Sequence, residues 1–194
     1  MGVAMKALGN WRSNADRHFA PNEVVAFWRA SSDHWFEKDA AFDAAFRDRF
    51  LELHMAVAAR RHDNWMDTPH GTLALLILTD QFPRNAFRGT AHMFATDPLA
   101  RRYAQLALKA GHMARVEPDL RLFFCLPFAH SEDDANQELS VRLNAGLGQP
   151  WQEHAEGHRD IIRRFGRFPH RNPVLGRTTT LEEDAYLKGG GFQG

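Results

Sequence analysis

Apolar residues recur along most of the chain with the spacing of an α-helix. The clearest run has steps of three or four residues: Phe42, Phe46, Phe50, Leu53 and Val57. This spacing places its members on one face of a helix. Similar runs occur at 99–110, 135–143 and 151–165. Because alternating strand patterns are missing, we predict an all-α fold of about eight helices joined by short loops.

The segment 73–78 is apolar on every side and is short enough for a buried strand. Thr68 and Pro69, which precede it, match a helix cap followed by proline in the first turn. They favour a buried helix, as does the lack of a second strand candidate. Thr180 and Glu183 have capping-box spacing and predict another helix start.

Composition is that of a globular protein, with 194 residues, 44% hydrophobic and 25% charged residues. We expect one all-α domain over residues 19–188, a loose N-terminal leader at 1–18 and a flexible C-terminal tail at 189–194. No apolar run is long enough to span a bilayer and no secretory leader is present, so we expect a cytoplasmic protein without a membrane partner.

Charge and cysteine content narrow the possible functions. The 24 basic side chains equal the 24 acidic ones in number, which excludes binding of nucleic acid over the whole surface. A single cysteine, Cys125, excludes a disulfide framework and a cysteine-rich zinc site. Cys125 lies in an apolar segment and is interpreted as a small core residue rather than a nucleophile.

Two segments far apart in the chain share one pattern. FPRN at 82–85 is followed by Arg88-Gly89-Thr90, and FPHRN at 168–172 is followed by Gly176-Arg177-Thr178. Chance can produce such a likeness. The alternative is that two loops at helix ends use the same device to present arginine and asparagine.

The first candidate for chemistry is LTDQFPRN at 78–85. Asp80 is expected near the C-terminal end of the most apolar helix, where a carboxylate is unfavourable and needs a cation. Arg84 follows at helical ion-pair spacing. A structural role, in which these two residues lock the loop, is slightly favoured for Asp80 alone over a role in a polar site.

The second candidate is PFAHSEDD at 127–134. Ser131 is expected to begin a helix, so that the acids after it lie in a first turn where the helix dipole favours anions. That explains Asp133 and Asp134 without a function. His130 and Glu132 are instead candidates for an acid/base pair, or for two metal ligands that would need a third.

The third candidate is the segment 158–177, which holds six arginines against one acid. Guanidinium groups bind carboxylate or phosphate through paired hydrogen bonds. The segment predicts an anion pocket, unless its arginines are solvated or neutralise Glu132 and Asp80. His154 and His158 share one helix side, but their pattern is not that of a zinc protease, and we predict neither a bound metal nor another cofactor.

These motifs resemble one bacterial family over about residues 21–188, the domain of unknown function family 924. The resemblance rests on FW at 27–28, WF-x-KD-xx-FD at 35–43, LLILTDQFPRN at 75–85, PFAHSED at 127–133 and H-xx-II-x-RFGRFPHRN-xx-LGR-x-T-xx-E at 158–183. It implies a tetratricopeptide-like fold of packed α-hairpins but no known reaction. The motif positions suggest these ligand-binding candidates: Asp80, Gln81, Arg84, Asn85, His158, Arg164, Arg167, His170, Arg171, Asn172 and Arg177.

Three functions from different classes fit these observations. The first is a site for a small anionic molecule, in which His130 and Glu132 are acid/base candidates and enzymatic activity is left open. The second is a helical scaffold for a protein or peptide partner, with the polar motifs as an internal network. The third, nucleic-acid binding through the arginine-rich segment, is placed last because the segment lacks lysine and the chain has no net positive charge.

Overall fold

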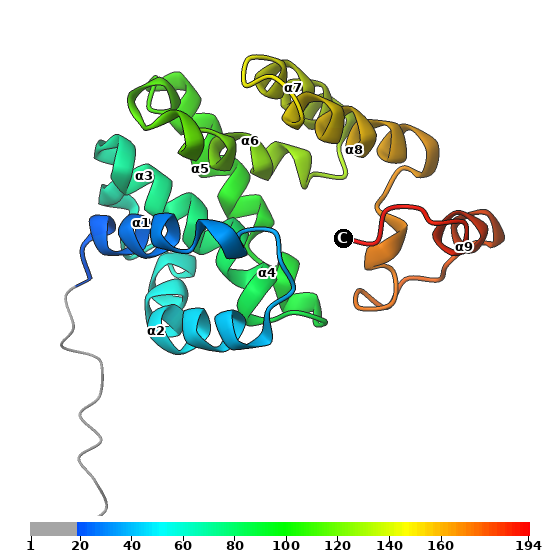
Figure 1. Cartoon of the computed structure of the whole chain (residues 1–194), viewed down its shortest axis with the longest axis horizontal. Helices are drawn as coiled ribbons and strands as arrows, with labels where there is room; N and C mark the ends of the chain where they lie inside the picture. Colours follow the sequence, from blue (N-terminus) through cyan, green and yellow to red (C-terminus); the bar gives the residue numbers. More distant parts are fainter. Residues whose placement is uncertain (1–18) are drawn as a thin grey trace, which may run out of the picture.

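The computed structural model describes residues 19–194, and the expected leader at 1–18 lies outside them. Helices and turns account for the regular structure of this part, so the predicted all-α fold is confirmed (Figure 1). The helices of at least eight residues are α1 (Pro21–Ala30), α2 (Ala40–Ala58), α3 (Pro69–Leu76), α5 (Asp97–Lys109), α6 (Leu122–Ala129), α7 (Asp134–Ala145), α8 (Trp151–Phe165) and α9 (Leu181–Lys188). Short 3-10 turns join several of them.

The apolar segment predicted as a buried helix forms the centre of the protein. α3 passes into a π-helical turn, η4 (Ile77–Gln81), and then into the five-residue helix α4 (Phe82–Ala86). Asp80 therefore lies inside a continuous helical rod and not near its C-terminal end, which corrects the expectation. A π-helical turn widens the helix locally and is frequent at functional sites.

The core contains the predicted helix faces. Phe46, Phe50 and Val57 of α2 are fully buried and pack with Trp28 of α1 and with the apolar residues of α3. Burial of a large apolar side chain contributes roughly 1.5 to 3 kcal/mol. The periodicity thus identified both the helix and its buried face.

The C-terminal part is built on a smaller core. α7 and α8 lie side by side, and the chain then turns back through η8 (Pro169–Arg171) to α9 (Figure 1). Ile161, Ile162 and Phe168 form a separate apolar cluster beneath this turn. The predicted capping box of α9 is present, because the Thr180 hydroxyl accepts from the Glu183 amide and the Glu183 carboxylate accepts from the Thr180 amide.

One helix start differs from the prediction. Asp133, and not Ser131, caps α7, because its carboxylate accepts a hydrogen bond from the Asn136 amide. The Ser131 hydroxyl, two residues earlier, instead accepts from the Asp133 amide. The tetratricopeptide-like arrangement stays a prediction. Among the described helices, none is long and apolar enough to cross a membrane.

Candidate functional site

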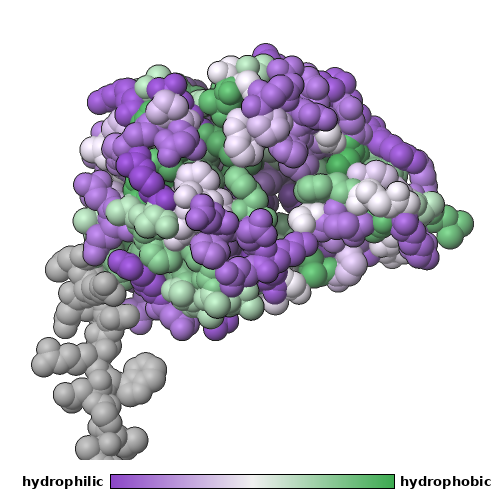
Figure 2. Space-filling view, in the orientation of Figure 1, coloured by the Kyte–Doolittle hydropathy of each residue, from purple (hydrophilic) through white to green (hydrophobic). Residues whose placement is uncertain are grey.

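A cavity of about 770 Å³ lies between α4, α6, α8 and the C-terminal segment. The surface is visibly hollowed there (Figure 2). Its apolar walls include Trp35, Phe36, Phe94, Leu122, Leu126, Trp151, Phe168 and Phe192. Its polar lining includes Gln81, Arg84, Asn85, Arg88, His130, Asn144, His154, His158, His170 and Arg171.

The two similar segments meet at one buried acidic residue, Asp97, which contacts two arginines of the cavity lining. Arg84 of FPRN donates to both carboxylate oxygens of Asp97, over 3.0 and 3.2 Å. Arg171 of FPHRN approaches the same carboxylate at 3.7 Å. Both guanidinium groups also face the ring of Phe94, at 5.8 Å for Arg84 and 4.5 Å for Arg171. The shared pattern therefore does present two arginines at one place.

Arg171 is the less well compensated of the two. Only 7% of its side chain is exposed, and its Nε atom has no hydrogen-bond partner. The guanidinium lies between the rings of Phe94 and Phe168, 4.5 and 4.4 Å from their centroids. Burial, together with the positive charge of Arg84, lowers the pKa of Arg171 to about 10. This cation lacks the close anionic partner that a buried charge requires.

Asp80 and His130 form a hydrogen-bonded pair at the edge of the cavity. His130 Nδ1 lies 2.8 Å from Asp80 Oδ1, and the Gln81 side-chain amide donates to Oδ2 at 2.6 Å. Arg84 stands 3.3 Å from the same carboxylate, as its spacing predicted. Burial alone would raise the pKa of Asp80, but Arg84 and His130 hold the pKa well below its usual value.

Two further imidazoles converge on the cavity. Burial lowers the pKa of His158 to about 3 and that of His170 to about 4, and the nearby Arg171 adds to both shifts. Each ring has a buried Nδ1 without a hydrogen-bond partner. Both rings are therefore neutral at pH 7, so Asp80 and Asp97 are the anions that face Arg84 and Arg171, and both of them lie closer to Arg84.

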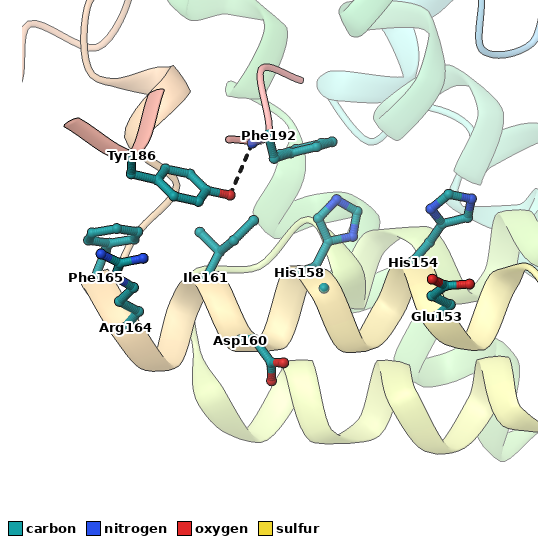
Figure 3. A pocket seen from close by; sticks show the side chains of 10 residues that line it. Glu153, His154, His158, Asp160, Ile161, Arg164, Phe165, Tyr186 and Phe192 are labelled. Atoms are coloured by element: carbon teal, nitrogen blue, oxygen red, sulfur yellow. Dashed lines mark hydrogen bonds between the residues drawn. The ribbon is translucent and has the colours of Figure 1, made fainter. Parts of the chain in front are cut away.

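Phe192 lines both this cavity and a smaller one of about 460 Å³, as do His154 and His158. Its ring lies edge-on to His158 and to His170, with centroid distances of 4.8 and 5.1 Å. Figure 3 shows His154 and His158 pointing from α8 toward the same side, with the Phe192 ring beside His158. The Phe192 amide donates to the Tyr186 hydroxyl at 3.0 Å. The C-terminal segment 189–194 thus packs against the site through Phe192. Whether this segment is flexible, as we expect from the sequence, stays a prediction.

Glu132 belongs to a different polar cluster, which fixes the loops around η8. Arg177 donates to both carboxylate oxygens of Glu132 at 2.8 Å, and the Phe168 amide donates to Glu132 at 2.9 Å. Burial would raise the pKa of Glu132, but these hydrogen bonds lower it. Arg167 binds both oxygens of Glu183 in the same way, at 2.6 and 2.8 Å.

The predicted site residues thus fall into two groups. Those that line the cavity are Gln81, Arg84, Asn85, His130, His158, His170 and Arg171. Asp80 lies directly beneath them as the partner of His130. Those held elsewhere by other contacts are Glu132, Arg164, Arg167, Asn172 and Arg177. His130 and Glu132 thus have separate partners, and their role as an acid/base pair stays a prediction.

Sequence reasoning missed the residues that complete the cavity. Asp97 and Pro98 match a helix cap followed by proline and predict only a helix start, and Phe94 lies in none of the motifs. Thr96, rather than Asp97, is the cap of α5, which leaves the Asp97 carboxylate free to bind Arg84. A first-turn acid not needed as a cap is a signal that could have indicated a partner.

The single cysteine, Cys125, is a residue of the protein interior. Cys125 is buried, and burial raises the pKa of its thiol to about 12, so the interpretation as a core residue is confirmed. Within residues 19–194, no group of three or more His, Cys, Asp or Glu side chains has the arrangement of a metal site.

The fold and the site together define an all-α protein with a cavity whose lining combines aromatic and aliphatic side chains with arginine, histidine and amide groups. The chain belongs to the family described as bacterial protein of unknown function (DUF924), whose model matches residues 24–191. A solved structure, that of the protein of unknown function ATU0120 from Agrobacterium tumefaciens, is similar to it with a TM-score of 0.85 and 55% sequence identity. The similarity covers 87% of this chain and 97% of the other. No curated protein matches the chain.

Proposed function

We propose that this protein binds a small organic anion, with a carboxylate at Arg171 and an apolar or aromatic body against the cavity walls. The observation that carries the proposal is the buried Arg171 guanidinium, whose Nε has no partner and whose nearest carboxylate lies at 3.7 Å. An anion would complete this group with charge-assisted hydrogen bonds, which are stronger than those between neutral groups.

The surroundings of Arg171 fit a small molecule. A volume of about 770 Å³ is within the usual range for ligand cavities, which are mostly apolar with a few polar groups that fix orientation. The neutral rings of His158 and His170 and the amides of Gln81 and Asn85 supply hydrogen bonds without adding negative charge. The walls carry six aromatic side chains, namely Trp35, Phe36, Phe94, Trp151, Phe168 and Phe192.

The alternative is a helical scaffold in which the arginines serve only the fold. That role fits Arg177 and Arg167, whose guanidinium groups are paired with Glu132 and Glu183. It does not fit Arg171, because a structural arginine is expected to have close partners for its buried donors. The two roles therefore apply to different arginines.

The test uses a matched pair of probes, 3-phenylpropionate and its neutral amide, 3-phenylpropionamide. We expect the acid to bind at least tenfold more tightly than the amide by isothermal titration calorimetry. Arg171→Met, which keeps the length of the side chain, should abolish that preference. The control, Arg163→Met, removes a solvent-exposed arginine that pairs with Glu138 and should leave both affinities unchanged.

Three results would contradict the proposal. They are equal affinity for acid and amide, an unchanged preference in Arg171→Met, and the failure of the acid to bind at all. Circular dichroism of each variant establishes that a lost preference does not come from a lost fold.

A further inference from the structure

We propose that the Asp80–His130 pair is a general base that activates water, and that the protein hydrolyses esters whose acid part carries a second, free carboxylate. This inference rests on the proposed function, because Arg171 is the group that holds the free carboxylate. The proposal adds ester hydrolysis to the anion binding that we propose for the same cavity.

The pair fixes the protonation of the imidazole. Asp80 is buried and ionised, so its carboxylate can only accept, and His130 Nδ1 at 2.8 Å must carry the hydrogen. In the neutral ring the lone pair is then on Nε2. Ring orientation by a carboxylate in this way is the usual support for a histidine base.

Nε2 is the ring nitrogen of His130 that Asp80 leaves free. The residue lines the cavity, and 17% of its side chain is exposed. Nε2 has no hydrogen-bond partner within the described part of the chain and is not sealed from solvent. Burial and the charge of Arg84 lower the pKa of His130, so its ring is neutral and able to accept a proton at pH 7. A base in this state can take a proton from water.

The lining of the cavity identifies the nucleophile as water. No serine, threonine, cysteine or tyrosine is among the described residues that line it. A side-chain hydroxyl or thiol is therefore not available to form a covalent intermediate with the substrate. Lys38 and Glu37, two further nucleophilic types, are exposed, and the imidazoles of the lining are assigned to proton transfer rather than to attack on the substrate.

A donor for the developing negative charge is also present. Asn85 is buried, lines the cavity, and has a side-chain Nδ2 without an acceptor. It stands next to Arg84 on α4. An unpaired donor of this kind can stabilise the oxyanion of a tetrahedral intermediate, and loss of one such donor typically costs about 100- to 1000-fold in rate.

The reaction then balances without another reactant. His130 Nε2 takes one proton from water while the water oxygen forms a bond to the ester carbonyl carbon, and the carbonyl oxygen becomes the oxyanion. The bond from that carbon to the ester oxygen then breaks, and the proton passes from Nε2 to the leaving oxygen. Water and ester become acid and alcohol, and His130 returns to its neutral form.

The substrate probe is 4-nitrophenyl succinate, a half-ester with one free carboxylate, and its uncharged counterpart is 4-nitrophenyl butyrate. Release of 4-nitrophenol is followed by absorbance. We expect kcat/KM for the charged ester to exceed that for the neutral one at least tenfold, after subtraction of the rate in buffer.

His130→Asn is the decisive variant. The asparagine amide can still donate to Asp80, but the base at Nε2 is gone. We expect kcat to fall at least 100-fold, while 3-phenylpropionate still binds more tightly than its amide because Arg171 is intact. The control His62→Asn changes a histidine that does not line the cavity and should keep full activity.

Asp80 is tested as a positioning residue. In the wild type, kcat/KM should fall on the acid side with an apparent pKa below 6.5, and Asp80→Asn should displace that pKa. Should Asp80→Asn fail to fold, the wild-type profile and His130→Asn decide the question. If the succinate ester is not hydrolysed above the buffer rate, or if His130→Asn is as active as the wild type, this inference is wrong. Binding of 3-phenylpropionate in the same protein would then still support the proposed function.

Discussion

FPRN and FPHRN end in the same cavity, yet the arginines around them have two different kinds of surroundings. In the cluster around η8, Arg177 and Arg167 are each paired with both oxygens of one glutamate. In the cavity, Arg84 is paired in this way with Asp97, whereas Arg171 is left 3.7 Å from the same carboxylate. Arginine content alone does not distinguish the two clusters.

This difference in pairing indicates which of the two clusters is expected to bind a ligand. A fully paired cluster has already exchanged water for protein partners and holds loops together. A cluster with unpaired buried donors carries a free-energy cost that a bound anion can remove. Arg171 and Asn85 each have such a donor, and His158 and His170 each have an unpartnered ring nitrogen. In the cluster around η8 the arginines and glutamates are paired, and the unpartnered atom there is an acceptor, the side-chain oxygen of Asn172.

The largest effect should come from breaking the paired cluster. Glu132→Gln removes the charge that holds Arg177 and weakens the bond to the Phe168 amide. We expect a loss of about 2 to 3 kcal/mol in the free energy of unfolding, since hydrogen bonds to charged groups contribute about that much. Urea denaturation at pH 7 measures it.

The matched control is Glu182→Gln, which breaks an exposed pair with Arg164. Surface pairs contribute little, so its stability should equal that of the wild type within error. Equal losses in the two variants would show that the Glu132 cluster is not a structural anchor.

The next largest effect is expected on the pH dependence of the free energy of unfolding, which arises from the buried histidines of the cavity. The folded-state pKa values of His158 and His170, about 3 and about 4, lie below the ordinary value of 6.5. Between these values the unfolded chain holds more protons, so the free energy of unfolding falls as pH falls below 6.5. Each histidine contributes a slope of up to about 1.4 kcal/mol per pH unit.

His158→Gln removes one of these titrating groups. We expect its acid-side slope, measured by urea denaturation between pH 6.5 and pH 4.5, to be shallower than that of the wild type by up to about 1.4 kcal/mol per pH unit. Parallel curves for the two proteins would show that His158 is protonated in the folded protein over this range.

Much of the fold could be predicted because helix periodicity is a local property. The faces of α2 and α3, the capping box of α9 and the Asp80–Arg84 pair depend on residues three or four positions apart. The π-helical turn at 77–81 could not be predicted, because nothing in its composition distinguishes it from an α-helical turn.

The site was harder to predict because its partners are distant in the chain. His130 and Glu132 are two residues apart, but one binds Asp80 and the other binds Arg177, 45 residues away. Their separation in sequence suggested a pair, and tertiary contacts gave each a different partner. Phe192 has no local signal of its role, and the local signal at Asp97 names no partner, since Arg84 and Arg171 reach it from distant parts of the chain.

Arg171→Met should show the opposite behaviour to Glu132→Gln. It removes a poorly compensated buried cation and leaves Asp97 paired with Arg84. The lost contacts with the rings of Phe94 and Phe168 offset part of the gain. We expect the free energy of unfolding without ligand to change by less than about 1 kcal/mol, because replacement of a buried charge by an apolar group is often neutral or stabilising. A loss as large as that of Glu132→Gln, by urea denaturation, would place Arg171 among the structural arginines.

Phe192→Ala should have the smallest effect on stability and a specific effect on the cavity. The ring is 41% exposed, so its removal should cost less than about 1 kcal/mol. Because Phe192 covers His158 and His170, its loss admits water and should raise the pKa of both rings toward 6.5. Histidine titration by NMR measures this rise, and His54, which stacks on Phe82 away from the tail, is the internal reference. Unchanged titration of His158 and His170 would mean that the protein around them, rather than the C-terminal segment, keeps these imidazoles neutral.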